Sequence, residues 1–158
     1  MYLLQINTHQ DADYKWMQYA FDLAKHAESL GEVPVGAVLI YQNEIIGEGY
    51  NQPINLQDPT AHAEIIALRQ GGQKLANYRM LDTTLYVTLE PCMMCVGAMV
   101  QARIGRLVFA ALDPKAGAVV SCVNGLAMPQ FNHRIEWQGE IMAAECGKLL
   151  QDFFRKRR

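Results

Sequence analysis

Residues 83–95 run Thr83-Thr-Leu-Tyr-Val-Thr-Leu-Glu-Pro-Cys-Met-Met-Cys95. The first seven residues are rich in β-branched and aromatic side chains, which predicts a central strand. Pro91 and Cys92 follow it and are suited to begin a helix. A strand that leads directly into a helix is the repeating unit of an α/β fold.

The segments on either side continue this alternation. Apolar residues at helical spacing predict a first helix that starts at Asp13 and ends at Gly31. A hairpin follows, with strands at 35–41 and 44–49 around Gln42 and Asn43. The remaining expected elements are a helix from Asp58-Pro59 to Gly71-Gly72, the helix from Pro91 to Gly105, strand 106–111, a short strand near 135–137 and an amphipathic helix from about Glu140. This order predicts a mixed sheet covered on both faces, hence a three-layer α/β/α sandwich.

The length of 158 residues suits one domain with a sizeable core. We therefore expect a single domain over 1–158, with 1–12 as a flexible N-terminal segment. No apolar run approaches the roughly 18 residues of a membrane helix, and the first residues lack the basic start of a signal peptide. We expect a cytoplasmic protein, in which closely spaced cysteines bind metal or do chemistry more often than they form disulfides.

The net charge of −2 does not by itself indicate nucleic-acid binding. Its distribution is uneven, since residues 1–105 hold 6 basic and 11 acidic side chains and residues 106–158 hold 8 basic and 5 acidic ones. The chain closes with Phe153-Phe-Arg-Lys-Arg-Arg158. These cations could interact favourably with the C-terminal dipole of their own helix, or they could bind phosphate. The charge distribution alone favours interaction with the helix dipole.

Two short motifs indicate chemistry: His62-Ala-Glu64 and Cys92-Met-Met-Cys95. Residues three apart on a helix are neighbours, so both sulfurs lie on one face. A helix N-terminus also favours thiolate over thiol. One imidazole and two thiolates suit Zn²⁺ by softness and number.

Three protein ligands are typical of a catalytic zinc site, which leaves a position for water. The two thiolates cancel the charge of the ion, so the bound water needs a proton acceptor beside it. Glu64 is placed to be that acceptor. It would take the proton of the water, leave a zinc-bound hydroxide as nucleophile, and return protons to a ring nitrogen and to departing ammonia.

The cysteine pair could instead be redox-active or half of a closed zinc clasp, with Cys122, Cys146 or His133 as fourth ligand. Cys146 falls on the apolar stripe of the last helix and is expected in the core, and Cys122 is expected to be a buried small side chain. For His133, hydrogen bonding and substrate contact both stay open. No glycine-rich phosphate loop is present, so no nucleotide cofactor is expected.

The pattern H-x-E…P-C-x-x-C is the signature of zinc nucleobase deaminases. The wider sequence resembles the bacterial tRNA adenosine deaminase family from about residue 14 to residue 158. The segments that carry the resemblance are 32–39, 47–54, 58–65, 84–95, 103–106, 113–117, 132–134 and 153–158. The zinc motif alone specifies only the cytidine deaminase superfamily, whereas the flanking segments indicate tRNA as the substrate.

The resemblance implies a five-stranded cytidine-deaminase-like fold, a homodimer and conversion of the wobble adenosine of a tRNA anticodon stem-loop to inosine. It assigns one zinc ion per subunit to His62, Cys92 and Cys95, and proton transfer to Glu64. The substrate contacts that it implies are Asn51, Pro53, Asp113, Lys115, Asn132, Phe153, Phe154 and Arg155.

Several of these side chains have a physical means of binding RNA. Asn51 has a donor and an acceptor for a base edge or ribose, and Asp113 can accept a bond from a 2′-hydroxyl. Lys115 and Arg155 can bind phosphate. Asn51 and Asp113 could instead be turn residues, because each is followed closely by proline.

The paired phenylalanines offer a stacking platform for bases. Phe153 continues the apolar stripe of the last helix, so packing is the alternative for it and Phe154 is the better stacking candidate.

Two other functions share parts of this pattern. A deaminase of a free base or nucleotide would use the same zinc site but would have little need of the basic aromatic tail. A non-catalytic, zinc-stabilised RNA-binding module would have a closed site with four ligands.

Overall fold

The computed structural model describes residues 8–158 and contains a five-stranded sheet in the order β2-β1-β3-β4-β5. Strand β1 is antiparallel to both β2 and β3, whereas β3, β4 and β5 are parallel. The sheet is therefore mixed, as predicted. Its strands are β1 (Gly36–Tyr41), β2 (Glu44–Tyr50), β3 (Thr84–Leu89), β4 (Arg106–Ala111) and β5 (Glu136–Gln138).

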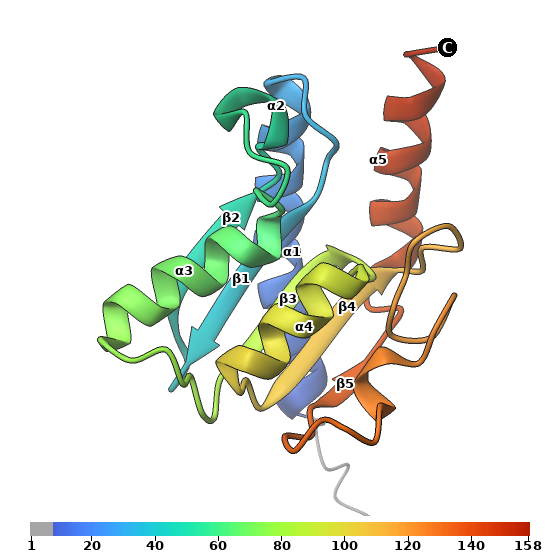
Figure 1. Ribbon diagram of the computed structural model, residues 1–158. Helices are drawn as coiled ribbons and strands as arrows, with labels where there is room; N and C mark the ends of the chain where they lie inside the picture. The colour runs from blue at the N-terminus through green and yellow to red at the C-terminus, as the bar shows by residue number, and fades with distance from the viewer. Residues whose placement is uncertain (1–7) are drawn as a thin grey trace, which may run out of the picture.

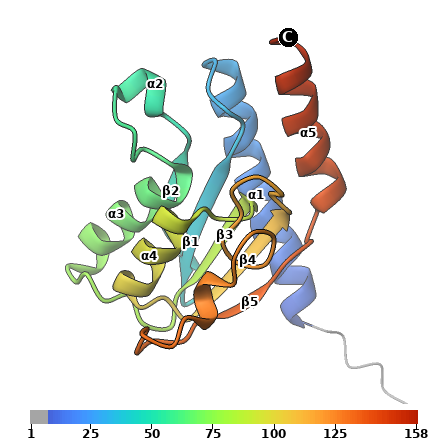
Figure 2. The same ribbon diagram turned by 45° about the vertical axis from the view of Figure 1, so that its right-hand side comes forward.

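Helices cover both faces of the sheet. One face carries α1 (Thr8–Ser29) and α5 (Ala143–Arg155), and the other carries α3 (Ala63–Leu75) and α4 (Met93–Ala102) (Figures 1 and 2). The predicted three-layer α/β/α sandwich is confirmed. Two short pieces complete the helices and strands of residues 8–158, namely α2 (Pro53–Leu56) and the 3₁₀ turn Gly125–Ala127.

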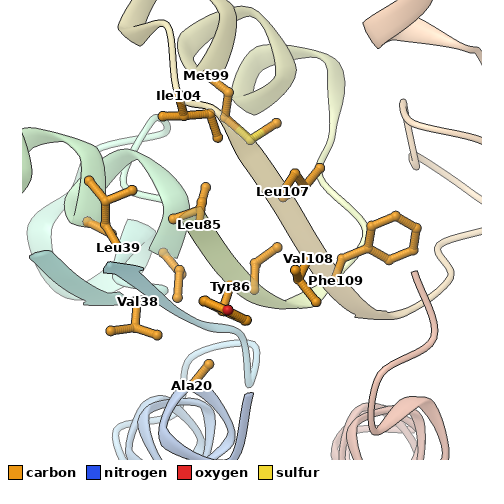
Figure 3. Close-up of a cluster of buried hydrophobic side chains, with 14 of the residues drawn as sticks. Ala20, Val38, Leu39, Leu85, Tyr86, Met99, Ile104, Leu107, Val108 and Phe109 are labelled. Carbon is orange, nitrogen blue, oxygen red and sulfur yellow. The ribbon is translucent and has the colours of Figure 1, made fainter. Parts of the chain in front are cut away.

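The core lies on both faces of the central strands. Successive side chains of a strand point to opposite faces, so Val38 and Tyr86 point toward Ala20 of α1 whereas Leu39 and Leu85 point away from it (Figure 3). All of these side chains are buried. This two-sided burial explains why the central strands are apolar throughout.

The hairpin between β1 and β2 forms as predicted. Its two turn residues, Gln42 and Asn43, have φ angles of 48° and 61°. Positive φ at both central positions is typical of a type I′ turn, whose twist matches that of the flanking strands.

The first helix differs from the expectation, because it already includes Thr8 and Asp13 lies in its interior. Asp13 is buried and accepts two hydrogen bonds from Arg106 at 2.7 and 2.8 Å, and one from Tyr86 Oη at 2.8 Å. An acidic residue near a helix start resembles an N-cap in sequence, but here a tertiary ion pair accounts for it. Of the expected flexible segment 1–12, residues 8–12 are helical and residues 1–7 lie outside the described residues.

The third helix begins at Ala63 rather than at Asp58, and it continues beyond the predicted stop at Gly71-Gly72. Gly71 serves close packing, because a Cβ there would lie 2.4 Å from Leu39 Cδ2. The helix ends instead at Leu75, because its C-cap Ala76 adopts the left-handed conformation. Helix α2 was not predicted.

No helix within residues 8–158 is long and apolar enough to cross a membrane.

Candidate active site

Helices α3 and α4 begin at the same edge of the sheet, where parallel strands β3 and β4 end (Figure 1). In an open α/β sheet this carboxyl edge is the usual location of a ligand site. Both helices direct their free N–H groups and positive dipole ends toward it. His62 is the N-cap of α3, and Cys92 is the N-cap of α4.

The chain before α3 is held by local hydrogen bonds. Asp58 Oδ1 accepts bonds from the backbone N–H and the hydroxyl of Thr60, at 2.8 and 2.7 Å. Asn51 Oδ1 accepts the N–H of Ala63 at 2.9 Å, which is one of the first free donors of α3. These bonds fix His62 at the helix start without help from its own side chain.

Three potential metal ligands converge at this point. His62 Nδ1 lies 3.6 Å from Cys92 Sγ and 3.6 Å from Cys95 Sγ. All three ligand atoms lie within 4.8 Å of one another. Cys95 is fully buried, while His62 and Cys92 are partly accessible.

These separations fit a tetrahedral zinc ion. Bonds of about 2.3 Å to sulfur and about 2.0–2.1 Å to nitrogen, at the tetrahedral angle, would hold the nitrogen about 3.6 Å from each sulfur. The observed separations of 3.6 Å agree with this value. The donor set also suits zinc, because soft thiolates and an imidazole are its preferred ligands.

The electrostatics favour a thiolate beside the imidazole. Hydrogen bonding from the Cys95 thiol, and then from His62, lowers the pKa of Cys92 to about 4. The same contact with Cys92, together with burial, raises the pKa of Cys95. The pKa of His62 is raised, chiefly by its hydrogen bond with Cys92.

Glu64 lies in the first turn of α3 and is 4% exposed. Burial is the main cause that raises its pKa to about 7. The charge of His62 lowers this pKa and the charge of Cys92 raises it, both by less than burial does. A carboxyl group that gains and loses its proton near neutral pH, beside a metal ligand set, is suited to move protons.

The sequence-based candidates for a fourth ligand lie elsewhere. Within the described part of the chain, the group that could hold a metal consists of His62, Cys92 and Cys95 alone. Cys146 is buried in the core, as predicted. His133 Nε2 is bonded to the carbonyl of Ile104 at 2.6 Å.

The expectation that Cys122 is buried is wrong, because this residue is exposed. It lies in a series of turns, where its thiol donates to Pro114 O at 3.3 Å. A small apolar side chain was expected to be buried, but this position lies at the surface.

Four of the proposed RNA contacts lie on the segments that follow β2 and β4 at the same edge: Asn51, Pro53 at the start of α2, Asp113 and Lys115. Asn51 is nearly buried and uses Oδ1 as a cap, as described above, which leaves its Nδ2 without a protein partner among the described residues. Asp113 Oδ1 accepts the N–H groups of Lys115 at 3.0 Å and Ala116 at 3.2 Å. Asn51 and Asp113 thus stabilise the local backbone, as the alternative of a turn residue suggested. The second polar atom of each side chain, Nδ2 of Asn51 and Oδ2 of Asp113, remains available for RNA.

The aromatic pair divides into one buried and one exposed ring. Phe153 is 5% exposed and packs in the interior, with the Arg157 guanidinium 4.2 Å from its ring centroid. Phe154 is 48% exposed and meets Phe153 edge to face. Arg155 is exposed and paired with Asp152 of its own helix. Phe154 is therefore the accessible stacking surface.

The structure does not bring Asn132 to this edge. It precedes β5, which is parallel to β4 and pairs Glu136 with Arg106 at the start of that strand. Parallel strands begin at the same edge, and His133 beside Asn132 is hydrogen bonded to Ile104, just before β4, so this segment lies at the edge opposite the proposed ligands. The segment 113–134 must return to that edge before β5 can pair in parallel.

Two buried glutamates at the edge were missed by the sequence analysis. Glu32 is 1% exposed and Glu90 is 2% exposed, and each accepts several backbone N–H groups. The available signal was a charged residue inside an apolar segment, directly before a proline in the case of Glu90.

Comparison with known proteins places the chain in a family. A family model described as MafB19-like deaminase matches residues 11–158. The tRNA-specific adenosine deaminase of Haemophilus influenzae is 54% identical over 147 residues, which cover 92% of this chain and 85% of that protein. The chain belongs to the family of tRNA-specific adenosine deaminases.

Solved structures agree with this membership. One from work on A-to-I editing by tRNA:A34 deaminases at the wobble position of transfer RNA matches with a TM-score of 0.84 and 39% identity. The match covers 86% of this chain and 99% of that one. Guanine deaminase from Nitrosomonas europaea matches with a TM-score of 0.77, covering 89% of this chain and 83% of that one; at 21% identity this shows the shared fold alone. The five-stranded deaminase fold predicted for this family is confirmed.

Proposed function

We propose that this protein hydrolyses adenosine to inosine at the wobble position of a tRNA anticodon, with one zinc ion per subunit held by His62, Cys92 and Cys95. The observation that carries the proposal is the group of three ligand atoms at tetrahedral zinc separations, with a buried carboxyl beside it. The similarity to tRNA-specific adenosine deaminases supports a tRNA adenosine as the substrate.

A zinc ion in this position would supply a Lewis acid that makes a bound water molecule acidic enough to lose a proton near neutral pH. Glu64 would accept that proton at a carboxylate oxygen, because its pKa of about 7 suits both uptake and release. It would then deliver protons to N1 of the adenine ring and to the departing amine. The buried position of Glu64 keeps competing water away from the carboxyl.

The substrate contacts follow from the loops at the same edge. An anticodon loop is single-stranded, so its base can turn into a pocket at modest cost. Asn51 would donate from Nδ2 to the base or ribose, and Asp113 would accept from a 2′-hydroxyl with its remaining oxygen. Lys115 and Arg155 would bind phosphate, Pro53 would line the loop, and Phe154 would stack on a flanking base.

The deciding experiment compares Glu64→Ala with the parent protein on a tRNA anticodon stem-loop and on free bases. We expect Glu64→Ala to keep its zinc and to lose at least about 10²-fold in the rate of inosine formation, since a proton-transfer residue typically contributes that much. Inosine is measured by sequencing and zinc by atomic absorption. Parent protein that deaminates only free bases would contradict the substrate, and an active Glu64→Ala variant would contradict the role of Glu64.

We further propose that the protein is a cytoplasmic homodimer. A groove of about 520 Å³ between α3 and α4 has an apolar lining that includes Ile65, Leu68 and Met80, and Tyr78 at its rim is 68% exposed. A second copy covering this groove would bury the exposed ring of Tyr78. Light scattering should give twice the chain mass for the parent protein and a reduced mass for Tyr78→Glu; a monomeric parent protein would contradict the proposal.

A further inference from the structure

Glu90 lies between the end of β3 and the metal-ligand segment that begins at Pro91. Its backbone N–H donates to Ala111 O at 2.8 Å and so continues the pairing of β3 with β4 beyond the strands. Its side chain is 2% exposed, and it has no part in the proton transfers described above. A buried carboxylate is costly unless it is hydrogen bonded, so its partners indicate its purpose.

Among residues 8–158, all the hydrogen-bond partners of this carboxylate come from one segment, residues 113–121. Oε2 accepts the consecutive backbone N–H groups of Val119, Val120 and Ser121 at 3.1, 2.9 and 3.0 Å. Oε1 accepts the N–H of Asp113 at 3.1 Å and the hydroxyl of Ser121. Successive N–H groups that converge on one anion form a nest, and here the anion belongs to the protein itself.

The segment closes tightly around the carboxylate. A Cβ on Gly117 would lie 2.4 Å from Glu90 Cδ and 2.5 Å from each carboxylate oxygen, so no side chain fits between them. The N–H of Ala118 also donates to Pro91 O at 2.8 Å. The segment is thus attached to residues 90 and 91, immediately before Cys92.

This attachment joins two parts of the site. Residues 113–121 include Asp113 and Lys115, whereas Glu90 is two residues from Cys92. We propose that Glu90 is a positioning residue, whose carboxylate holds the segment 113–121 at a fixed place relative to the zinc ligands so that bound RNA presents its adenosine to the reacting group. The inference rests on the proposed function for the identity of the substrate, but the attachment itself does not depend on it.

The main variant is Glu90→Gln, which keeps the shape but replaces one acceptor oxygen with a donor facing N–H groups. We expect KM for the anticodon stem-loop to rise about 10- to 100-fold, because the RNA contacts of Asp113 and Lys115 would be misplaced and hydrogen bonds to charged groups are worth about that factor. The values of kcat and bound zinc should stay unchanged within about twofold. A role in stability alone would leave KM unchanged in the folded protein. The control is Glu44→Gln. Glu44 is exposed beside the β1–β2 turn, at the edge of the sheet away from the proposed active site, so this variant should change neither KM nor kcat.

Hydrogen exchange tests the attachment without substrate. The amides of Val119, Val120 and Ser121 should exchange slowly in the parent protein and faster in Glu90→Gln. This result stands even if the parent protein fails to deaminate RNA, which separates failure of the inference from failure of the proposed function.

Two further variants apply if Glu90→Gln does not fold. Ser121→Ala removes one donor, and Gly117→Ala pushes a methyl group against the carboxylate, so both should raise KM and loosen the segment, the first by less. Unchanged KM and unchanged exchange in the folded variants would overturn the proposal. Loss of zinc and kcat at an unchanged KM would overturn it as well, because Glu90 would then support the metal rather than the RNA contacts.

Discussion

At the scale of single residues, two of the three proposed zinc ligands are also helix caps. His62 and Cys92 have extended backbones, and their carbonyls accept the N–H groups of Ile66 and Val96 at 3.1 and 2.9 Å. The first hydrogen bonds of α3 and α4 therefore set the positions of the ligand Cα atoms. This arrangement leaves few rotatable bonds between the backbone and the ligand atoms, which favours a preformed site.

The four cysteines should differ sharply in reactivity. Cys122 is exposed, whereas Cys146 is buried and burial raises its pKa to about 12. In the zinc-loaded protein, an alkylating reagent at mildly alkaline pH should modify Cys122 first and leave Cys146 untouched until the protein is unfolded, since thiolate is the reactive form. Peptide mapping by mass spectrometry checks the order. Rapid modification of Cys146 in the folded protein would contradict its position in the core.

At the scale of elements, the buried Asp13 ties α1 to the sheet through β3 and β4. We expect Asp13→Asn to lower the free energy of unfolding by about 2–3 kcal/mol, because removing one partner of a buried ion pair strands the other, although Arg106 keeps 24% exposure to water. Urea denaturation measures this value. Asp11→Asn, on the exposed side of the same helix, is the control and should change stability by less than about 0.5 kcal/mol. Equal effects of the two variants would contradict the assignment.

Helix α2 is held by the second buried glutamate. Glu32 accepts the N–H groups of Ile54 and Asn55 at 3.2 and 2.9 Å and the amide of Asn55 at 2.6 Å. Burial alone would raise the pKa of Glu32, but the hydrogen bonds from Asn55 and Ile54 and the charge of Arg157 together lower it below its ordinary value of 4.5.

A lowered carboxyl pKa in the folded state stabilises the protein above the unfolded value, and that stability is lost as pH falls through the folded value. We therefore expect Glu32→Gln to be less stable than the parent protein at neutral pH, with the difference shrinking below about pH 4.5. Thermal unfolding of both proteins across this range gives the comparison. A difference that stays constant with pH would show that the carboxylate charge is not the cause.

At the scale of the whole molecule, the strands, the three layers and the convergence of His62 with Cys92 and Cys95 could all be predicted from the sequence. Local periodicity and motif spacing carry that information. Asn132 could not be placed, because its position depends on where β5 pairs rather than on its neighbours in the chain. The same limit applies to Gly71, whose close neighbour Leu39 lies in a segment distant in sequence.

The basic tail is also clear only in three dimensions. Arg157 donates to Gly31 O at 2.8 Å, and Lys156 lies 3.8 Å from Glu28, so these cations attach α5 to the end of α1. Neither explanation offered by the sequence describes these contacts, because they join α5 to α1 instead of acting on the dipole of α5 itself. Arg157 and Lys156 serve the fold, while Arg155 beside the exposed Phe154 is the one proposed to meet RNA.

The two helix caps that face each other have a further consequence for the chain as a polymer. They are 30 residues apart in sequence, so an ion bound to both would close a loop of that length. In the chain-entropy model of cross-links, closing such a loop lowers the conformational entropy of the unfolded state, which destabilises that state by about 3–4 kcal/mol. The same ion would therefore act as a reversible cross-link between the β2–α3 and β3–α4 units. The free energy of unfolding of the protein would then depend on the concentration of available metal.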